Sequence, residues 1–238
     1  DADSLAYKKL FYGPSEQRSI DTLERMLGEE QYRKVRNSLR ESGLRTGFTC
    51  LFYGTPGTGK TETVYQLAKK TGRKIIVADV SKLKNCFVGE SEKSLTKLFD
   101  DYRKCVKTMD VAPILLFNEA DAIFGIRQEG AQRAVDKMEN SLQNILLQEM
   151  EKLDGILIAT TNLTQNLDKA FERRFLYKVR FEKPSLETKS KIWSSMMPEL
   201  TESQAEELAR EYDFSGGQIE NISRKKKIQS IIECREPD

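Results

Sequence analysis

The chain has 238 residues, and its 38% hydrophobic and 32% charged residues are the ordinary balance of a folded globular protein. At about 150 residues per domain, this length predicts one medium domain with an appendage, or two small domains. The longest apolar run, residues 111–117, is far shorter than the roughly 20 residues that cross a bilayer. We therefore expect neither a membrane-spanning segment nor a membrane partner.

The charge balance and the absence of histidine limit the possible chemistry. Lys and Arg number 39 against 37 Asp and Glu, a formal net charge of +2, so no global field favours a nucleic-acid partner. The four cysteines are irregularly spaced, which indicates reduced thiols in a cytoplasmic protein. Without histidine, Ser-His-Asp catalysis and histidine metal sites are excluded. Any catalysis must use carboxylates, amides, Lys, Arg and a bound cation.

The N-terminal segment predicts helices that lead into the body of the protein. Apolar side chains recur at helical spacing from Ile20 to Leu39, so we assign residues 1–46 to an N-terminal helical lead-in. The first residue is Asp1 and no signal-peptide pattern follows it. We expect the sequence to be a piece of a longer protein.

The middle of the chain alternates short β-prone runs with longer helical patterns. The runs lie at residues 49–53, 75–80, 114–117, 156–161 and 179–181. Such alternation predicts an α/β fold with a parallel sheet and helices on both faces. We expect the longest helix at residues 129–152, where one apolar stripe would pack on the core.

After Pro184 the strands stop and three helical segments remain, at residues 186–197, 202–212 and 216–232. The second and third begin with the spacing of a capping box. We therefore predict a large α/β nucleotide-binding domain at residues 47–183 and a small all-helical lid domain at residues 184–238.

Residues 54–61 read Gly-Thr-Pro-Gly-Thr-Gly-Lys-Thr between a predicted strand and a predicted helix. This is the pattern and context of a P-loop NTPase, in which backbone N–H groups surround phosphate oxygens. Lys60 would reach the β- and γ-phosphates and the Thr61 hydroxyl would ligate Mg²⁺. The expected ligands are ATP and Mg²⁺. The predicted nucleotide-binding residues of this region are Thr55, Pro56, Gly57, Thr58, Gly59, Lys60, Thr61 and Glu62.

A second group of candidate catalytic residues follows the apolar run 114–117. Asn118 and Glu119 come directly after it, where open α/β sheets place ligands. Glu119 could orient or deprotonate the water that attacks ATP. The alternative is an exposed carboxylate at the end of a strand.

Four further motifs follow in order. Residues 87–93 read Phe-Val-Gly-Glu-Ser-Glu-Lys, residues 160–162 read Thr-Thr-Asn, Leu167 and Asp168 precede Arg173-Arg174-Phe175, and residues 214–217 read Phe-Ser-Gly-Gly. With the phosphate loop and the Glu119 strand, they resemble the AAA+ ATPases, most closely the clade that contains katanin, spastin and the AAA proteases. The resemblance covers about residues 48–225.

The resemblance implies roles for these residues. Asn162 corresponds to the sensor that positions water, and Arg173 and Arg174 to arginine fingers that complete a neighbour's site. Gly216 and Gly217 correspond to the lid turn that meets the nucleotide. The expected substrate-gripping pore loop is Phe87, Val88 and Gly89. The implied enzyme is an ATP hydrolase that remodels or unfolds a protein substrate as a ring homo-oligomer, most often a hexamer.

The chain departs from the family pattern at two places. Asn118 stands where the family usually has Asp; it could hold Mg²⁺ through a water but brings no negative charge. Weaker Mg²⁺ binding and slower turnover are therefore hypotheses, which Asn118→Asp tests. The finger arginines are adjacent instead of separated, and Arg174, beside Phe175, is our first choice.

Several alternatives stay open. The arginines could be surface ion-pair partners of Glu172 or Glu182, and Phe87 could be an ordinary core residue. The cationic run 224–227 is read as an exposed helix face, not as a nucleic-acid contact. An ATP-dependent assembly switch with slow or vestigial hydrolysis is the alternative function, favoured by Asn118. A nucleic-acid motor is opposed by the near-neutral charge.

Overall fold

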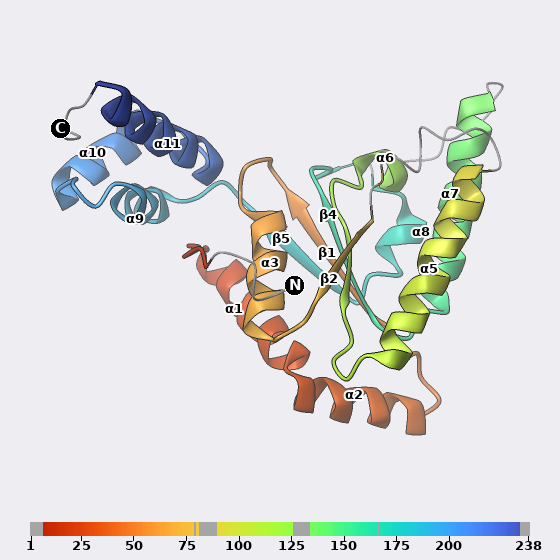
Figure 1. Ribbon diagram of the computed structural model, residues 1–238. Helices are drawn as coiled ribbons and strands as arrows, with labels where there is room; N and C mark the ends of the chain where they lie inside the picture. The colour runs from red at the N-terminus through yellow and green to blue at the C-terminus, as the bar shows by residue number, and fades with distance from the viewer. Residues whose placement is uncertain (1–6, 79, 81–89, 126–133, 166, 234–238) are drawn as a thin grey trace.

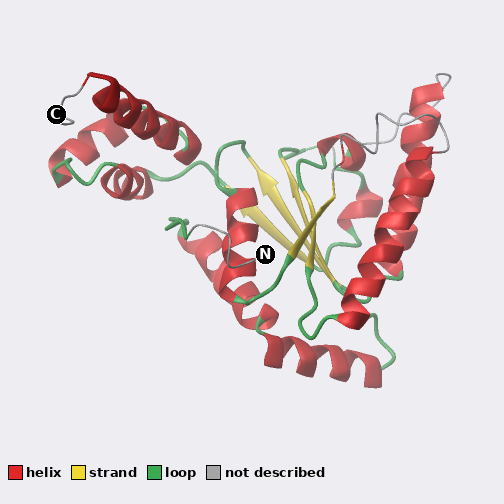
Figure 2. Cartoon of the chain, in the orientation of Figure 1, coloured by secondary structure: helices red, strands yellow, loops and turns green. Residues whose placement is uncertain are grey.

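The computed structural model describes residues 7–78, 80, 90–125, 134–165 and 167–233 (Figure 1). A parallel sheet lies at the centre of the larger part of the molecule, with helices on both of its faces (Figure 2). A group of helices formed by the C-terminal residues is set to one side and joined to the sheet by a single connection (Figure 1). The predicted fold class is confirmed.

The sheet has five strands in the order β2-β3-β4-β1-β5, and every pair is parallel. Its central strands are apolar and buried, as a sheet covered on both faces requires. The strands are β1 (Phe48–Gly54), β2 (Ile75–Ala78), β3 (Ile114–Phe117), β4 (Ile156–Thr161) and β5 (Tyr177–Phe181).

Helices cover the sheet from both sides and form the lid. The bounds in the larger part are α1 (Pro14–Leu27), α2 (Glu29–Glu41), α3 (Lys60–Lys70), α5 (Glu90–Thr108), α6 (Asp121–Phe124), α7 (Ala134–Glu151) and α8 (Lys169–Glu172). The lid helices are α9 (Leu186–Met196), α10 (Glu202–Glu211) and α11 (Gly216–Glu233).

Alternate residues of the strands point into two separate cores. Leu115 and Phe117 of β3 pack with α5 and α7, whereas Ile114 and Leu116 pack with α1 and α3 on the opposite face. The period of two along a strand produces this division. Helix α1 therefore belongs to the same packed body as the sheet.

The lid has its own small core around Trp193, Ala205 and Ile219. Both predicted capping boxes are present. The Thr201 hydroxyl accepts from the Gln204 N–H while the Gln204 side chain accepts from the Thr201 N–H, and Ser215 and Gln218 make the same pair of bonds. Within the cationic run, Lys226 forms an ion pair with Glu199 at 3.2 Å.

Some predicted element bounds differ from the structure. Strand β2 ends at Ala78, two residues before the predicted end, and β5 begins at Tyr177, two residues before the predicted start. Helix α7 begins at Ala134, and residues 129–133 of the predicted helix lie outside the described residues. The described part of α7 has 18 residues and that of α5 has 19, so the predicted rank of this helix by length stays a prediction. No described helix is both long and apolar enough to cross a membrane.

We predict that Tyr102→Phe lowers the free energy of unfolding by about 1–3 kcal/mol, because the buried Tyr102 hydroxyl satisfies backbone groups of two strand regions. It lies 2.9 Å from the carbonyl oxygens of Pro113 and Ile156 and accepts from the Ile156 N–H at 2.7 Å. Urea denaturation measures the change. Tyr7→Phe is the control, because Tyr7 is 66% exposed, and an equal effect of both variants would contradict the prediction.

Candidate functional site

The loop between β1 and α3 needs glycine at three positions. Gly54, Gly57 and Gly59 have φ values of 138°, 75° and 89°, a region that residues with side chains rarely adopt. A Cβ on Gly54 would lie 2.0 Å from the Phe181 carbonyl oxygen of the neighbouring strand. Gly59 is the N-cap of α3, so the loop runs directly into the N-terminus of this helix, where the N–H groups of the first turn have no partner within the helix. This geometry suits an anion.

Lys60 is 7% exposed, and its ammonium group donates to the carbonyl oxygens of Gly54 at 2.9 Å and Thr55 at 2.7 Å. Burial lowers the pKa of Lys60, and the negative charges of Asp121 and Glu119 oppose this shift. The loop therefore holds a buried cation against its own backbone oxygens. Such a group is ready to exchange these partners for an anionic ligand.

The tips of β3 and β4 meet the start of α3 through one amide oxygen. Asn118 Oδ1 accepts from the Thr61 hydroxyl at 2.6 Å and from the Thr160 hydroxyl at 2.9 Å. The next residue, Glu119, has φ 52°, and its N–H donates to Thr160 Oγ1 at 3.0 Å. Left-handed backbone is unfavourable for a residue with a side chain, so this bond helps to hold an exposed carboxylate in a strained position.

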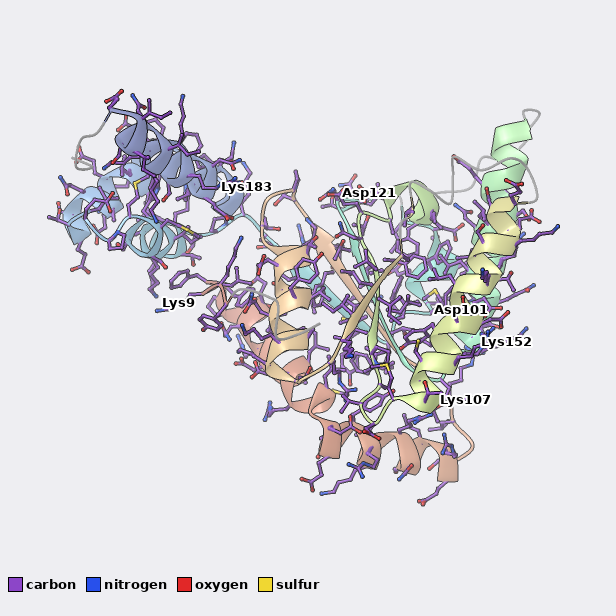
Figure 3. All side chains as sticks on the ribbon, in the orientation of Figure 1. Lys9, Asp101, Lys107, Asp121, Lys152 and Lys183 are labelled. Carbon is purple, nitrogen blue, oxygen red and sulfur yellow. The ribbon has the colours of Figure 1, made fainter. Side chains whose placement is uncertain are left out.

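A second polar cluster surrounds Asp121 at the start of α6, beside the ends of the strands (Figure 3). Its carboxylate accepts from the Thr161 hydroxyl, from the Asn162 N–H at 2.7 Å and from the Asn162 side-chain amide at 3.2 Å. Asp121 thus orients Asn162. Sequence reasoning assigned no role to Asp121, although it stands two residues after Glu119.

The lid touches the phosphate loop directly. The Gly217 N–H donates to the Gly57 carbonyl oxygen at 3.2 Å. A Cβ on Gly57 would lie 2.5 Å from Ser215 Oγ, so the two segments approach closely. The predicted lid turn therefore lies at the phosphate loop.

The N-terminal segment closes the same region. Lys8 forms ion pairs with Glu220 of α11 at 2.9 Å and with Glu62 of α3 at 3.7 Å, and its hydrogen bond to Glu220 raises its pKa. The Tyr12 hydroxyl lies 3.0 Å from Thr63 Oγ1, and burial raises the pKa of Tyr12 to about 12, so this hydroxyl stays protonated near neutral pH. From the sequence, this segment is assigned only to the helical lead-in, so its contacts with α3 and α11 are a finding of the structure.

These parts enclose a cavity of about 570 Å³. Its walls are the phosphate loop, the tips of β3 and β4, the N-terminal segment 8–16 and the lid. Of the predicted nucleotide-binding residues only Thr55 does not line it; the Thr55 hydroxyl is buried without a hydrogen-bond partner. Glu119 and Asn162 line the cavity, while Asn118 lies behind Thr61.

The two arginines differ in their surroundings. Arg174 donates to Glu151 at 2.5 Å and to the Ala170 carbonyl oxygen at 2.9 Å. Arg173 is exposed and has no ion-pair partner within the part of the chain that the structure describes. The suggested partners are engaged elsewhere, since Glu172 pairs with Lys178 and Glu182 with Arg180, so those two ion pairs are not formed. 

The candidate pore-loop residues Phe87, Val88 and Gly89 lie outside the described residues, so their role stays a prediction. The described ranges also contain no group of three or more His, Cys, Asp or Glu side chains that could hold a metal ion. A cation at this site would therefore need oxygen ligands from the nucleotide as well as from the chain.

In the comparison with known proteins, residues 50–183 match the ATPase family associated with various cellular activities (AAA). Protein CdcH of Halobacterium salinarum is 30% identical over 197 residues, which are 79% of this chain and 26% of that protein. The proteasome-associated ATPase of Streptosporangium roseum is 30% identical over 213 residues, 82% of this chain and 35% of that ATPase.

Fidgetin-like protein 1 of Drosophila melanogaster is also similar, with 27% identity over 198 residues, 78% of this chain and 37% of the fly protein. The chain thus spans between about a quarter and two fifths of the length of these three relatives.

We predict that Asp121→Ala lowers the free energy of unfolding by about 1–3 kcal/mol, because the buried Thr161 hydroxyl and the Asn162 N–H lose their shared acceptor. Asp101→Ala is the matched control, since Asp101 on α5 makes only an exposed ion pair with Lys104, worth less than about 0.5 kcal/mol. Both carboxylates are labelled in Figure 3. Equal denaturation curves for the two variants would contradict the prediction.

Proposed function

Because this chain belongs to the ATPase family associated with various cellular activities, whose enzyme class is ATP hydrolase, we propose that its cavity binds Mg-ATP for hydrolysis. We further propose that the whole protein uses this hydrolysis to remodel or unfold a protein substrate as a ring homo-oligomer, most simply a hexamer. The lead-in, large domain and lid keep the proposed bounds of 1–46, 47–183 and 184–238.

The observation that carries the proposal is the buried ammonium group of Lys60 at the glycine-rich loop beside the cavity. Its hydrogen bonds go to two loop carbonyl oxygens, which a phosphate oxygen could replace as partners. A charge-assisted hydrogen bond to phosphate is stronger than a bond to a neutral carbonyl. The loop N–H groups and the N-terminus of α3 add further donors.

Thr61 Oγ1 and Asn118 Oδ1 fit a magnesium site, because Mg²⁺ prefers oxygen ligands and commonly uses few protein groups plus phosphates. Thr61 would bind the ion directly. From the sequence, Asn118 is expected to act through a water, but its oxygen already accepts the Thr61 and Thr160 protons, so in this proposal it orients the Thr61 hydroxyl. When bound, Mg²⁺ offsets negative charge on the phosphate oxygens. Because Asn118 is neutral, we expect weaker cation binding here than beside a carboxylate.

Glu119 is the proposed group that polarises the attacking water, since its exposed carboxylate lines the cavity at the tip of β3. Asn162, held by Asp121, would help to position that water. As the water oxygen bonds to the γ-phosphorus, the bond from that phosphorus to the β–γ bridging oxygen breaks, ADP leaves with the bridging oxygen, and the water's proton goes to Glu119.

Arg173 is the proposed arginine finger toward the neighbouring subunit, in place of our first choice from sequence, Arg174. An arginine that must reach another molecule has to be free, and Arg173 is exposed. Arg174, tied to Glu151, would hold the segment in position. An arginine stabilises the charge that develops in phosphoryl transfer.

The protein substrate is a proposal that rests on the family and on relatives such as the proteasome-associated ATPase. Phe87, Val88 and Gly89 would contact that substrate. The free thiols of Cys50 and Cys105 support a cytoplasmic location. A second function, an assembly switch with slow hydrolysis, is favoured by the neutral Asn118.

The test is ATP hydrolysis per subunit, with Mg²⁺, over a wide range of protein concentration. We predict a specific rate that rises with concentration, because each site needs a neighbour. Glu119→Gln should lower the rate by about 10²–10⁴-fold. Arg173→Ala should lower it by about 10³-fold with ATP binding retained.

Arg180→Ala is the control, since Arg180 is exposed but pairs with Glu182 of its own chain. A rate that is independent of concentration and survives Arg173→Ala would contradict assembly of the site between subunits. ATP binding with negligible hydrolysis at every concentration would favour the switch.

A further inference from the structure

We propose that Thr160 is a positioning residue for the cation site, because its hydroxyl fixes which end of the Asn118 amide faces Thr61. The inference rests on the proposed function, since it concerns how Mg²⁺ joins the nucleotide. It assigns to Thr160 a role in the strength of Mg²⁺ binding that is separate from its place in the fold.

Strand register brings the three side chains together. In the parallel pair of β3 and β4, Phe117 lies opposite Ala159, so Asn118 and Thr160 follow at the same level. Thr160 is 1% exposed, and its hydroxyl donates to Asn118 Oδ1 at 2.9 Å. Thr61, the second residue of α3, donates to the same oxygen at 2.6 Å. One amide oxygen therefore receives two hydroxyl protons.

The direction of these bonds follows from a backbone group. The Glu119 N–H can only donate, and it lies 3.0 Å from Thr160 Oγ1. The Thr160 oxygen accepts this bond, and among the described residues Asn118 Oδ1 is the acceptor of the Thr160 proton. If the NH₂ end of Asn118 faced Thr160, this buried hydroxyl would accept two bonds and its proton would lose that acceptor. The chain of donors runs from the Glu119 N–H through Thr160 to the amide oxygen.

The orientation of an Asn side chain has to be fixed by its hydrogen bonds, whereas an Asp side chain presents an oxygen either way. The oxygen and nitrogen ends of an Asn side chain have similar shapes, but one accepts hydrogen bonds and the other donates them. If the NH₂ end faced Thr61, the Thr61 oxygen would accept a bond from it. One of the lone pairs that could bind a cation would then be occupied. Two donating hydroxyls favour the oxygen end. The two oxygens of Asp would make this choice irrelevant.

The consequence concerns Thr61, which lines the cavity. While Asn118 accepts its proton, the Thr61 hydroxyl keeps its lone pairs for a hard cation. Loss of the Thr160 hydroxyl removes one of the two groups that select this arrangement. The nucleotide itself is held by the loop, so its affinity without Mg²⁺ should not change.

The experiment measures the dissociation constant of a fluorescent ATP analogue for the whole chain, once with Mg²⁺ and once with EDTA. The ratio of the two constants is the factor by which Mg²⁺ tightens binding. We expect Thr160→Val, which keeps the side-chain shape, to lower this factor roughly fivefold, the value of one hydrogen bond of about 1 kcal/mol. Thr160→Ser should restore it.

Two further variants separate positioning from a merely structural effect. In an Asn118→Asp background, Thr160→Val should change the Mg²⁺ factor by less than about twofold, because a carboxylate has no wrong end. Thr161→Val removes an equally buried hydroxyl from the same strand tip, one that donates to Asp121 instead. It should leave the factor within about twofold, and melting temperatures report the fold of every variant.

Equal losses in the Asn118 and Asn118→Asp backgrounds, or an equal loss in Thr161→Val, would overturn the proposal. So would tight binding of the analogue that Mg²⁺ does not improve in the unmodified chain, although nucleotide binding would then stand. Failure of the folded, unmodified chain to bind the analogue at all would overturn the proposed function itself.

Discussion

The parallel register of β3, β4 and β1 is the constraint on which the site depends. These strands are adjacent in the sheet and end at the same edge, where β1 continues into the phosphate loop. The tips of β3 and β4 therefore meet behind the loop, and Asn118, Thr160 and Thr61 come within hydrogen-bond distance. A shift of one residue in β4 would turn Thr160 to the opposite face and separate it from Asn118.

The other walls of the cavity come from segments far from the sheet in sequence. The lid contacts the loop through Gly217, and Lys8 links α3 to α11 through carboxylates on both helices. These polar contacts are partly exposed, unlike the buried cores on the two faces of the sheet, and Phe11 of the N-terminal segment adds apolar packing against the small core of the lid. Exposed ion pairs contribute little free energy, so the lid is held to the loop less firmly than the helices are held to the sheet.

The sequence predicted the parts of the fold that obey local rules. Residues 114–117 and 156–161 form β3 and β4 with the predicted bounds, because buried apolar runs end there in polar residues. The phosphate loop follows from its glycines, and the capping boxes from their spacing. The links of Thr160 to Asn118 and of Lys8 to two helices depend on strand register and on packing between distant segments, which no local pattern records. Arg174 differs from Arg173 because it forms an ion pair with Glu151 of α7, and this contact between distant segments is also absent from any local pattern.

The proposed function depends on whether the cavity beside Lys60 binds the nucleotide. A crystal structure of the chain with Mg²⁺ and a non-hydrolysable ATP analogue would locate the nucleotide. We predict that phosphate oxygens replace the carbonyl oxygens of Gly54 and Thr55 as partners of the Lys60 ammonium group. We also predict that the adenine base of the analogue lies between segment 8–16 and the lid. A nucleotide bound elsewhere, with the Lys60 bonds unchanged, would show that this cavity is not the nucleotide site.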